Sequence, residues 1–223
     1  MKAVLLYSGG LDSTTILYAL LAHNKQFDTI VVNSKDAVKK IELFPLMINY
    51  GQKHSVELHF AKQILQANKL TAKEYLIDWS SFRGQAQPGN QSAVHPHRNM
   101  MFMTIAFGYA SLVGADTVYV GWNISDDADF PDCREKFLET FQDAIRLSAD
   151  NKKLFLKAPL LKLNKAEILA YAQKYKVPVD KVWYCYRPQP QTSTYTPCGQ
   201  CYSCRLMAEA KSKEVKVEGD LIL

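Results

Sequence analysis

The sequence contains no apolar run long enough to cross a membrane and no internal repeat. A membrane-spanning helix needs about 18 consecutive apolar residues, and none of the 223 positions belongs to such a run. The N-terminus enters a predicted strand at once, without the charged and apolar regions of a signal peptide. Low-complexity tracts are also lacking. We therefore expect a cytoplasmic protein with no membrane partner.

Two common nucleotide-binding patterns are missing as well. The dinucleotide pattern G-x-G-x-x-G is absent, and no glycine is followed by the Lys-Ser or Lys-Thr pair of a Walker loop. The chain has instead the stretch Ser8-Gly9-Gly10-Leu11-Asp12-Ser13. It lies between an apolar run at 3–7, typical of a buried strand, and a helical pattern at 14–23.

A glycine turn between a strand and a helix is a favourable place for an anion. Its backbone N–H groups and the helix dipole together present partial positive charge. Gly9 and Gly10 let the backbone approach a phosphate closely, and Ser8 and Ser13 add hydroxyl groups. An ordinary turn capped by Asp12 or Ser13 is the alternative. The six residues together, placed after a first strand, resemble the pyrophosphate loop of the ATP pyrophosphatase family.

Strands alternate with helices along the rest of the chain. Apolar residues make up 48% of the sequence, enough for a full core. Further strands are predicted at 29–33, 41–49, 75–77, 117–121 and 155–158, and further helices at 54–68, 99–112, 137–147 and from 165 to before Pro178. The alternation predicts an α/β, Rossmann-like three-layer fold with a mostly parallel sheet.

Three stretches of the chain add a candidate edge strand, a loop and a helix cap to this prediction. The two strands around the polar turn 34–40 can form a hairpin, which would add an edge strand. The polar stretch 80–96 is interpreted as a mobile loop or lid. Asn164 and Glu167 have the spacing of a capping box at the start of the last predicted helix.

Three loops are expected to meet at one crevice. Ser8, Tyr50 and Trp122 each follow a predicted strand, and ligands of such sheets bind beyond the carboxyl ends of the strands. The net charge of +5 permits a phosphate-rich ligand but does not call for nucleic acid.

Four of the five cysteines cluster late in the chain, in a pattern that favours a metal over disulfides. Cys198, Cys201 and Cys204 are spaced by three residues, and Cys185 precedes them. Four thiolates can bind structural Zn²⁺ in a tetrahedral shell. Buried thiols or a redox pair are the alternatives. Cys133 stands apart and is expected to be a small core residue, with a nucleophilic role as the other interpretation.

These pieces resemble the 7-cyano-7-deazaguanine synthase family over nearly the whole chain. The matching stretches are Ser8 to Thr15, Tyr50 to His54, Arg98-Asn99, Pro131 to Arg134, Ala158 to Leu160 with Lys165 to Ile168, Cys185-Tyr186, and Cys198 to Arg205. The resemblance implies an adenine nucleotide α-hydrolase-like domain at 1–180 and a four-cysteine zinc segment at 181–223 packed on it.

The resemblance also implies a reaction and its cofactors. The family uses ATP and Mg²⁺ to activate the carboxylate of 7-carboxy-7-deazaguanine, and ammonia then gives an amide and finally a nitrile. The implied catalytic residues are Asp12, Arg98, Asp132 and Lys165. The implied ATP-binding residues are Ser8, Gly9, Gly10, Leu11, Asp12 and Ser13, and the zinc ligands are the four late cysteines. Tyr50, Gln52 and Asn99 are candidates for contacting the deazapurine. A homodimer is left open.

The sequence departs from the family on the acceptor side. Asn49 replaces an aspartate, and acidic residues precede Pro131 where the family has an aromatic residue, serine, glycine and tyrosine. Asp126, Asp127, Asp129 and Asp132 would place up to four carboxylates around one crevice. Such a crevice could hold an ammonium group, although a solvated acidic loop is the simpler interpretation.

Two other hypotheses stand beside this one, and only the first rests on these departures. The first keeps the activation step but transfers the deazaguanine acyl group to another amine, such as a protein N-terminus, as in antiviral relatives of the family. The second is a nucleic-acid-binding module built on the zinc segment, whose aromatic residues could stack on bases. That segment lacks a dense patch of Lys and Arg, which disfavours the second hypothesis.

Overall fold

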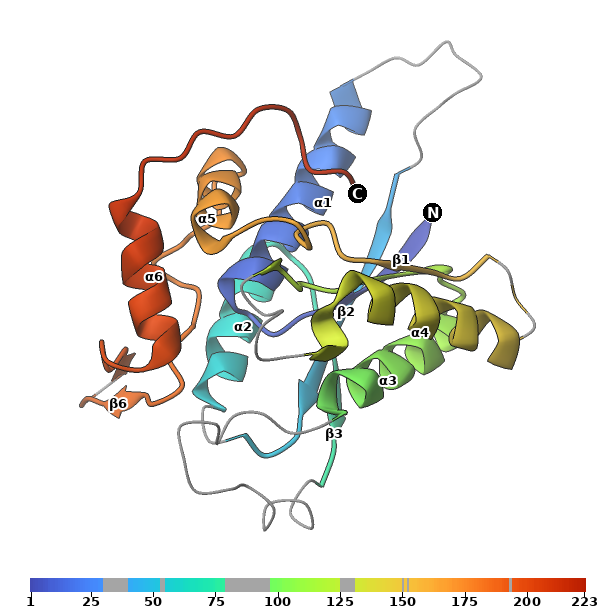
Figure 1. The fold of residues 1–223 in the computed structure, drawn as a ribbon, viewed down its shortest axis with the longest axis horizontal. Helices are drawn as coiled ribbons and strands as arrows, with labels where there is room; N and C mark the ends of the chain where they lie inside the picture. The colour runs from blue at the N-terminus through green and yellow to red at the C-terminus, as the bar shows by residue number, and fades with distance from the viewer. Residues whose placement is uncertain are drawn as a thin grey trace.

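Five parallel strands form the centre of the structure, which is a computed structural model (Figure 1). It describes residues 1–29, 40–52, 55–78, 97–124, 131–149, 151, 153–192 and 194–223, with the side chains of 26–29 excepted. The strands are β1 (Lys2–Leu6), β2 (Glu42–Asn49), β3 (Lys73–Leu76), β4 (Thr117–Tyr119) and β5 (Phe155–Lys157). Their order in the sheet is β3-β2-β1-β4-β5, and every pairing is parallel.

Helices cover both faces of this sheet. They are α1 (Leu11–Thr29), α2 (Val56–Ala67), α3 (Arg98–Val113), α4 (Glu135–Ser148), α5 (Lys165–Lys174) and α6 (Tyr202–Ser212), with a 3-10 turn η3 at Pro131–Cys133. A short antiparallel pair, β6 (Gln189–Pro190) and β7 (Tyr195–Thr196), precedes α6. The α/β three-layer prediction is therefore confirmed.

Side chains that alternate along β1 pack against both helical layers. Ala3 and Leu5 face α1, α2 and α5 in one buried cluster, whereas Val4 faces α3 and α4 in another. Successive side chains of a strand point to opposite faces, so a continuous apolar run supplies both cores. In Figure 1, α3 and α4 lie together on one side, and α5 and α6 lie on the other.

The C-terminal segment is fastened to the main core. Met207 and Ala210 of α6 belong to the buried cluster around α1 and α5. After α6 the chain crosses α5, where the backbone N–H of Leu221 donates to the Tyr175 hydroxyl at 2.8 Å. Lys174 and Asp220 also form an ion pair at 3.0 Å. These contacts join the end of the chain to the helix that carries Lys165.

The first helix and the segment after it differ from the sequence prediction. The helix was expected to end at 23, but α1 continues to Thr29. The predicted strand at 29–33 is therefore wrong at its first residue, and its other positions lie outside the described residues. The polar turn at 34–40, except its last residue, and the stretch 80–96 also lie outside them. Helix α6 and the β6-β7 pair were not predicted.

Within the residues that the structure describes, no helix combines the length and the apolar composition that crossing a membrane requires.

Candidate active site

The glycine turn after β1 packs closely against α2. Gly9 has a φ of +79°, and a Cβ added there would lie 2.5 Å from the Cβ of Ala61 in α2. Only glycine fits this conformation and this contact without a shift. The Ser8 backbone N–H donates to Ser13 Oγ at 3.3 Å, which closes the turn over the first turn of α1. The structure thus supplies a preformed loop at a helix N-terminus, the usual setting for a phosphate.

A second close approach fixes the loop against β4. A Cβ on Gly121 would lie 3.0 Å from the backbone nitrogen of Ser13. The end of β4 therefore passes directly beside the start of α1. This junction between β1 and β4 is where the strand order of the sheet reverses direction, a common position for ligands in open α/β sheets.

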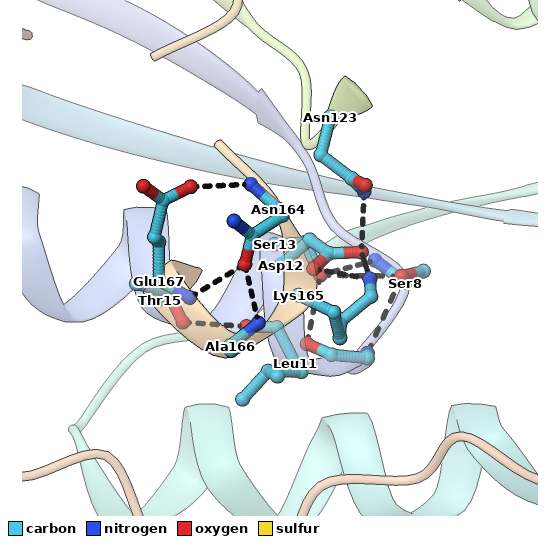
Figure 2. Close-up of polar contacts among 11 residues, drawn as sticks. Ser8, Leu11, Asp12, Ser13, Thr15, Asn123, Asn164, Lys165, Ala166 and Glu167 are labelled. Atoms are coloured by element: carbon cyan, nitrogen blue, oxygen red, sulfur yellow. Dashed lines mark hydrogen bonds and ion pairs between the residues drawn. The ribbon is translucent and has the colours of Figure 1, made fainter. Parts of the chain in front are cut away.

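Asp12 and Lys165 form an ion pair at the mouth of the loop (Figure 2). Lys165 Nζ lies 2.8 Å from both carboxylate oxygens of Asp12. The Asn123 side chain also donates to Asp12 Oδ2, at 3.4 Å. The side chains of Lys165 and Asp12 are only 14% and 24% exposed, so the lysine is not the solvated surface charge that was its alternative interpretation.

The capping box predicted at the start of α5 holds Lys165 in place. Asn164 Oδ1 accepts hydrogen bonds from the backbone N–H groups of Ala166 and Glu167, at 3.0 and 3.1 Å. Glu167 Oε2 in turn accepts from the Asn164 backbone N–H at 2.7 Å (Figure 2). The cap fixes the first turn of α5, and Lys165 is the first residue of that turn.

A cavity of about 240 Å³ opens beside the loop. Ser8, Tyr50 and Trp122 all line it, as expected from their positions directly after predicted strands. Its wall also includes Asp12, Ser13, Glu57, Arg98, Asn99 and Phe102. One cavity therefore joins the phosphate loop to residues from the ends of β2 and β4 and from the first turns of α2 and α3.

A hydrogen-bonded group of side chains forms one wall of this cavity. Gln52 Oε1 accepts from the Tyr50 backbone N–H at 3.0 Å, and Gln52 Nε2 donates to Glu57 Oε1 at 2.9 Å. Arg98 lies against Tyr50, with Nη1 at 3.5 Å from the hydroxyl oxygen. Burial raises the pKa of Glu57 to about 7, although the Gln52 hydrogen bond and the Arg98 charge lower it in part. Burial also raises the pKa of Tyr50.

Asn99 connects α3 to η3. Its Nδ2 donates to Asp132 Oδ1 at 3.1 Å and lies 3.3 Å from Cys133 Sγ. Cys133 is 4% exposed and packs with Trp122 and Phe141, which fits its interpretation as a core residue. Asp132 is thus brought beside a cavity-lining residue, whereas Asp126, Asp127 and Asp129 lie outside the described residues.

The four late cysteines come together as a candidate metal site. Their Sγ atoms all lie within 4.8 Å of one another, and those of Cys198 and Cys204 are 3.9 Å apart. Zn–S bonds of about 2.3 Å give a tetrahedron with S···S edges of about 3.8 Å, so these thiols fit a four-coordinate ion. The backbone N–H groups of Gln200 and Cys201 lower the pKa of Cys198 to about 6, which favours a thiolate. Burial raises the pKa of Cys185 and Cys204.

The cysteine site touches the phosphate loop through Trp183. The Trp183 ring stacks on Phe60 of α2 with centroids 5.0 Å apart, within the cluster that includes Cys185. The Trp183 backbone N–H donates to the Gly9 carbonyl at 3.3 Å. Trp183, Glu57 and Asn123 were not among the site residues expected from the sequence. Glu57 follows Tyr50-Gly51-Gln52 closely, which was the only signal available for it.

Comparison with known proteins places this site in context. A family model described as "Queuosine biosynthesis protein QueC" matches residues 2–214. The 7-cyano-7-deazaguanine synthase of Acetivibrio thermocellus is 33% identical over 223 residues, covering 92% of this chain and 90% of that one. The 7-cyano-7-deazaguanine synthase 2 of Desulfitobacterium hafniense is 33% identical over 235 residues, covering 96% and 91%.

A solved structure shares the fold at lower sequence similarity. The U34-tRNA thiolase NcsA from Methanococcus maripaludis, solved with its 4Fe-4S cluster, superposes with a TM-score of 0.54 at 17% identity. The match covers 95% of this chain and 63% of the thiolase. At this identity the likeness concerns the fold alone.

Proposed function

Because this chain belongs to the family of the queuosine biosynthesis protein QueC, we propose that it is a 7-cyano-7-deazaguanine synthase. It would convert 7-carboxy-7-deazaguanine and ammonia into the nitrile with two molecules of ATP, and it would work in the cytoplasm, where thiols stay reduced. The observation that carries the proposal is the cavity that joins the phosphate loop to Tyr50 and Arg98. Phosphate and planar substrate can meet there.

The proposed reaction removes both carboxylate oxygens, each on a molecule of AMP. A carboxylate oxygen attacks the α-phosphorus of ATP, and pyrophosphate leaves. Ammonia then adds to the acyl carbon, AMP departs with the first oxygen, and an amide remains. The amide oxygen attacks the α-phosphorus of a second ATP, and a second pyrophosphate leaves. Loss of AMP and of two protons from nitrogen then gives the nitrile.

Each group at the loop has a proposed part in the activation step. The backbone N–H groups from Ser8 to Ser13 and the start of α1 would hold the departing pyrophosphate. Lys165, oriented by Asp12, would add positive charge beside the phosphates. Arg98 is a second proposed cation, and Asp132, which accepts a hydrogen bond from Asn99, is proposed to act on the acceptor side. Mg²⁺, when bound with ATP, would offset charge on the phosphates.

The four-cysteine site is proposed to hold a structural Zn²⁺. A shell of four thiolates has no open position for substrate, so the ion would fasten the C-terminal segment and take no part in the chemistry. The curated relatives give no support to the other two hypotheses, transfer to a protein N-terminus and a nucleic-acid-binding module.

A turnover assay followed by mass spectrometry tests the proposal. The protein is incubated with Mg-ATP, ammonium and 7-carboxy-7-deazaguanine, and AMP, pyrophosphate, amide and nitrile are measured. We expect two AMP per nitrile, and no AMP with 7-deazaguanine, which lacks the carboxylate. Carboxylate-dependent AMP release that stops at the amide would contradict the second half-reaction. Absence of carboxylate-dependent AMP would contradict the proposal as a whole.

A further inference from the structure

The carboxylate of Glu57 has no part in the chemistry described so far, although it lines the active-site cavity. Glu57 is the second residue of α2 and lies in the wall that also contains Tyr50 and Arg98. Its side chain is partly buried, and placing a carboxylate in such a site is costly unless hydrogen bonds compensate it. A carboxylate that lines a ligand cavity under this constraint is a candidate for contacting the ligand.

Gln52 determines how this carboxylate is oriented. The Gln52 side chain is 7% exposed, is held by the Tyr50 backbone through its oxygen, and donates through its nitrogen to Glu57 Oε1. A carboxylate accepts hydrogen bonds through two oxygens, and the Gln52 bond holds one of those oxygens in place. The group is thus an oriented acceptor on the cavity wall.

The position of the phosphate loop determines which part of the substrate would reach Glu57. The C7 carboxylate must approach the α-phosphate, so that end of the molecule would lie at Ser8 and Ser13, which line the cavity. The 2-amino group lies on the other ring of the bicycle, away from C7. Two carboxylates among the described residues line the cavity, and Asp12 is paired with Lys165, so Glu57 is the carboxylate that we assign to the 2-amino edge.

The cavity walls suit a flat heteroaromatic ring. Tyr50, Phe102 and Trp122 contribute aromatic surface, and the rings of Tyr50 and Phe102 lie 5.2 Å apart between centroids. Bases held outside a helix are commonly stacked on such side chains and bonded along their edges. The 2-amino edge of a deazaguanine presents two adjacent donors, N1–H and one N–H of the amino group. Two carboxylate oxygens match that pair, as in other bidentate contacts.

We propose that Glu57 is a specificity-determining residue, whose carboxylate accepts hydrogen bonds from the N1–H and 2-amino groups of the deazaguanine ring. The inference rests on the proposed function. It assigns to Gln52 the role of a positioning residue, which acts through Glu57. It also explains why a cavity that must admit a carboxylate substrate contains an acidic side chain. Glu57 would bind the 2-amino edge of one ring, whereas the substrate's own carboxylate is attached to the other ring.

The test compares two substrates in two proteins. Wild type and Glu57→Gln are assayed for kcat/KM with 7-carboxy-7-deazaguanine and with its analogue that lacks the 2-amino group. We expect wild type to prefer the natural ring by about 10- to 100-fold, the range that one bidentate contact provides. In Glu57→Gln the preference should fall to about threefold or less, because the amide offers one acceptor and one donor.

A structural or proton-transfer role predicts a different pattern. If Glu57 only supported the fold or accepted a proton from ammonium, Glu57→Gln would slow both substrates equally and leave the preference unchanged, which would overturn the inference. Equilibrium binding of the two compounds without ATP gives a second readout, which must show the same loss of preference. Glu42→Gln is the matched control, since Glu42 lies at the opposite end of β2 with its side chain 62% exposed.

The outcomes separate the inference from the proposed function. Wild-type turnover with an unchanged preference in Glu57→Gln would reject the role of Glu57 and leave the synthase activity standing. Failure of wild type to turn over or bind either compound would reject both. A circular-dichroism melting curve for each variant confirms that comparisons are made between folded proteins.

Discussion

Lys165 and Asp12 are separated by 153 positions in the sequence, yet their ion pair stands at the entrance to the phosphate loop. We predict that Lys165→Met lowers kcat/KM for ATP by about 100-fold, the usual scale for losing one charged contact to a transition state. The variant also leaves the Asp12 carboxylate to repel the phosphates. ATP titration of AMP release measures the effect. Lys162→Met, at a lysine with 79% side-chain exposure, is the matched control and should be unaffected.

The same pair makes a double-substitution test possible. Residues that share one interaction do not have additive effects. Asp12→Asn combined with Lys165→Met should therefore lose less activity than the product of the two single losses. Strictly multiplicative losses would show that the two side chains act independently, contrary to their 2.8 Å contacts.

Glu57 should also make substrate binding depend on pH. Burial raises its pKa from 4.5 to about 7, so the acid form predominates below that pH in the free enzyme. Among the residues that the structure describes, Arg98 and the phenol of Tyr50 are neighbours of Glu57 in the cavity wall. Only the ionised form accepts both N–H groups, so KM for the deazaguanine should rise about fivefold between pH 7 and pH 6. Steady-state assays across this range measure KM, and Glu57→Gln should remove the dependence. A slope that persists in the variant would assign the titration to another group.

Helix α2 contributes residues to three different contacts around the site. Glu57 lines the cavity, Phe60 stacks on Trp183, and Ala61 touches Gly9. We predict that Gly9→Ala destabilises the protein and weakens ATP binding, because the new Cβ meets Ala61 and the positive φ disfavours alanine. Gly10→Ala is the matched comparison for stability, since its Cβ would have ordinary contacts of 3.4 and 3.6 Å. Thermal melting of both variants should show a clearly larger loss for Gly9→Ala.

The cap of α5 links stability to activity. Asn164→Ala removes two hydrogen bonds at the start of the helix and should cost about 1 kcal/mol, which lowers Tm by about 2–4 °C in a chain of this size. Because Lys165 is the next residue, KM for ATP should rise as well. Asn164→Asp keeps an acceptor in the same place and should retain both properties. Equal losses in the two variants would show that the cap is not the cause.

Whether a segment forms a helix or a strand could be predicted where its own residues carried an apolar or capping pattern. The apolar run of β1 and the capping box of α5 are local signals, and both elements formed as expected. The end of α1 was missed because residues 24–29 are mostly polar and carry no helical period. Helix α6 was missed because the cysteine spacing dominates its first turn. Glu57 could not be predicted as a site residue, because its setting depends on Tyr50, which follows β2, and on Arg98 from α3.

For the whole molecule, the cysteine site connects the C-terminal segment to the loop through Trp183. We predict one Zn²⁺ per chain, and we expect its removal by a strong chelator to lower Tm and raise KM for ATP together. Metal analysis, melting curves and ATP titration measure the three quantities. Cys201→Ser should reproduce the loss, whereas Cys133→Ala, outside the cluster, should still bind one ion. An unchanged KM for the metal-free protein would show that the loop keeps its shape without the segment.

The backbone hydrogen bond between Trp183 and Gly9 also determines when the phosphate loop can gain its contacts during synthesis of the chain. The loop is synthesised before its partners, because its Gly9 carbonyl and its Asp12 carboxylate bind residues 183 and 165. At least 153 further positions, the separation of Asp12 and Lys165, must therefore be made before the loop has these contacts. A chain released before residue 165 would carry the complete nucleotide motif without the contacts that support it.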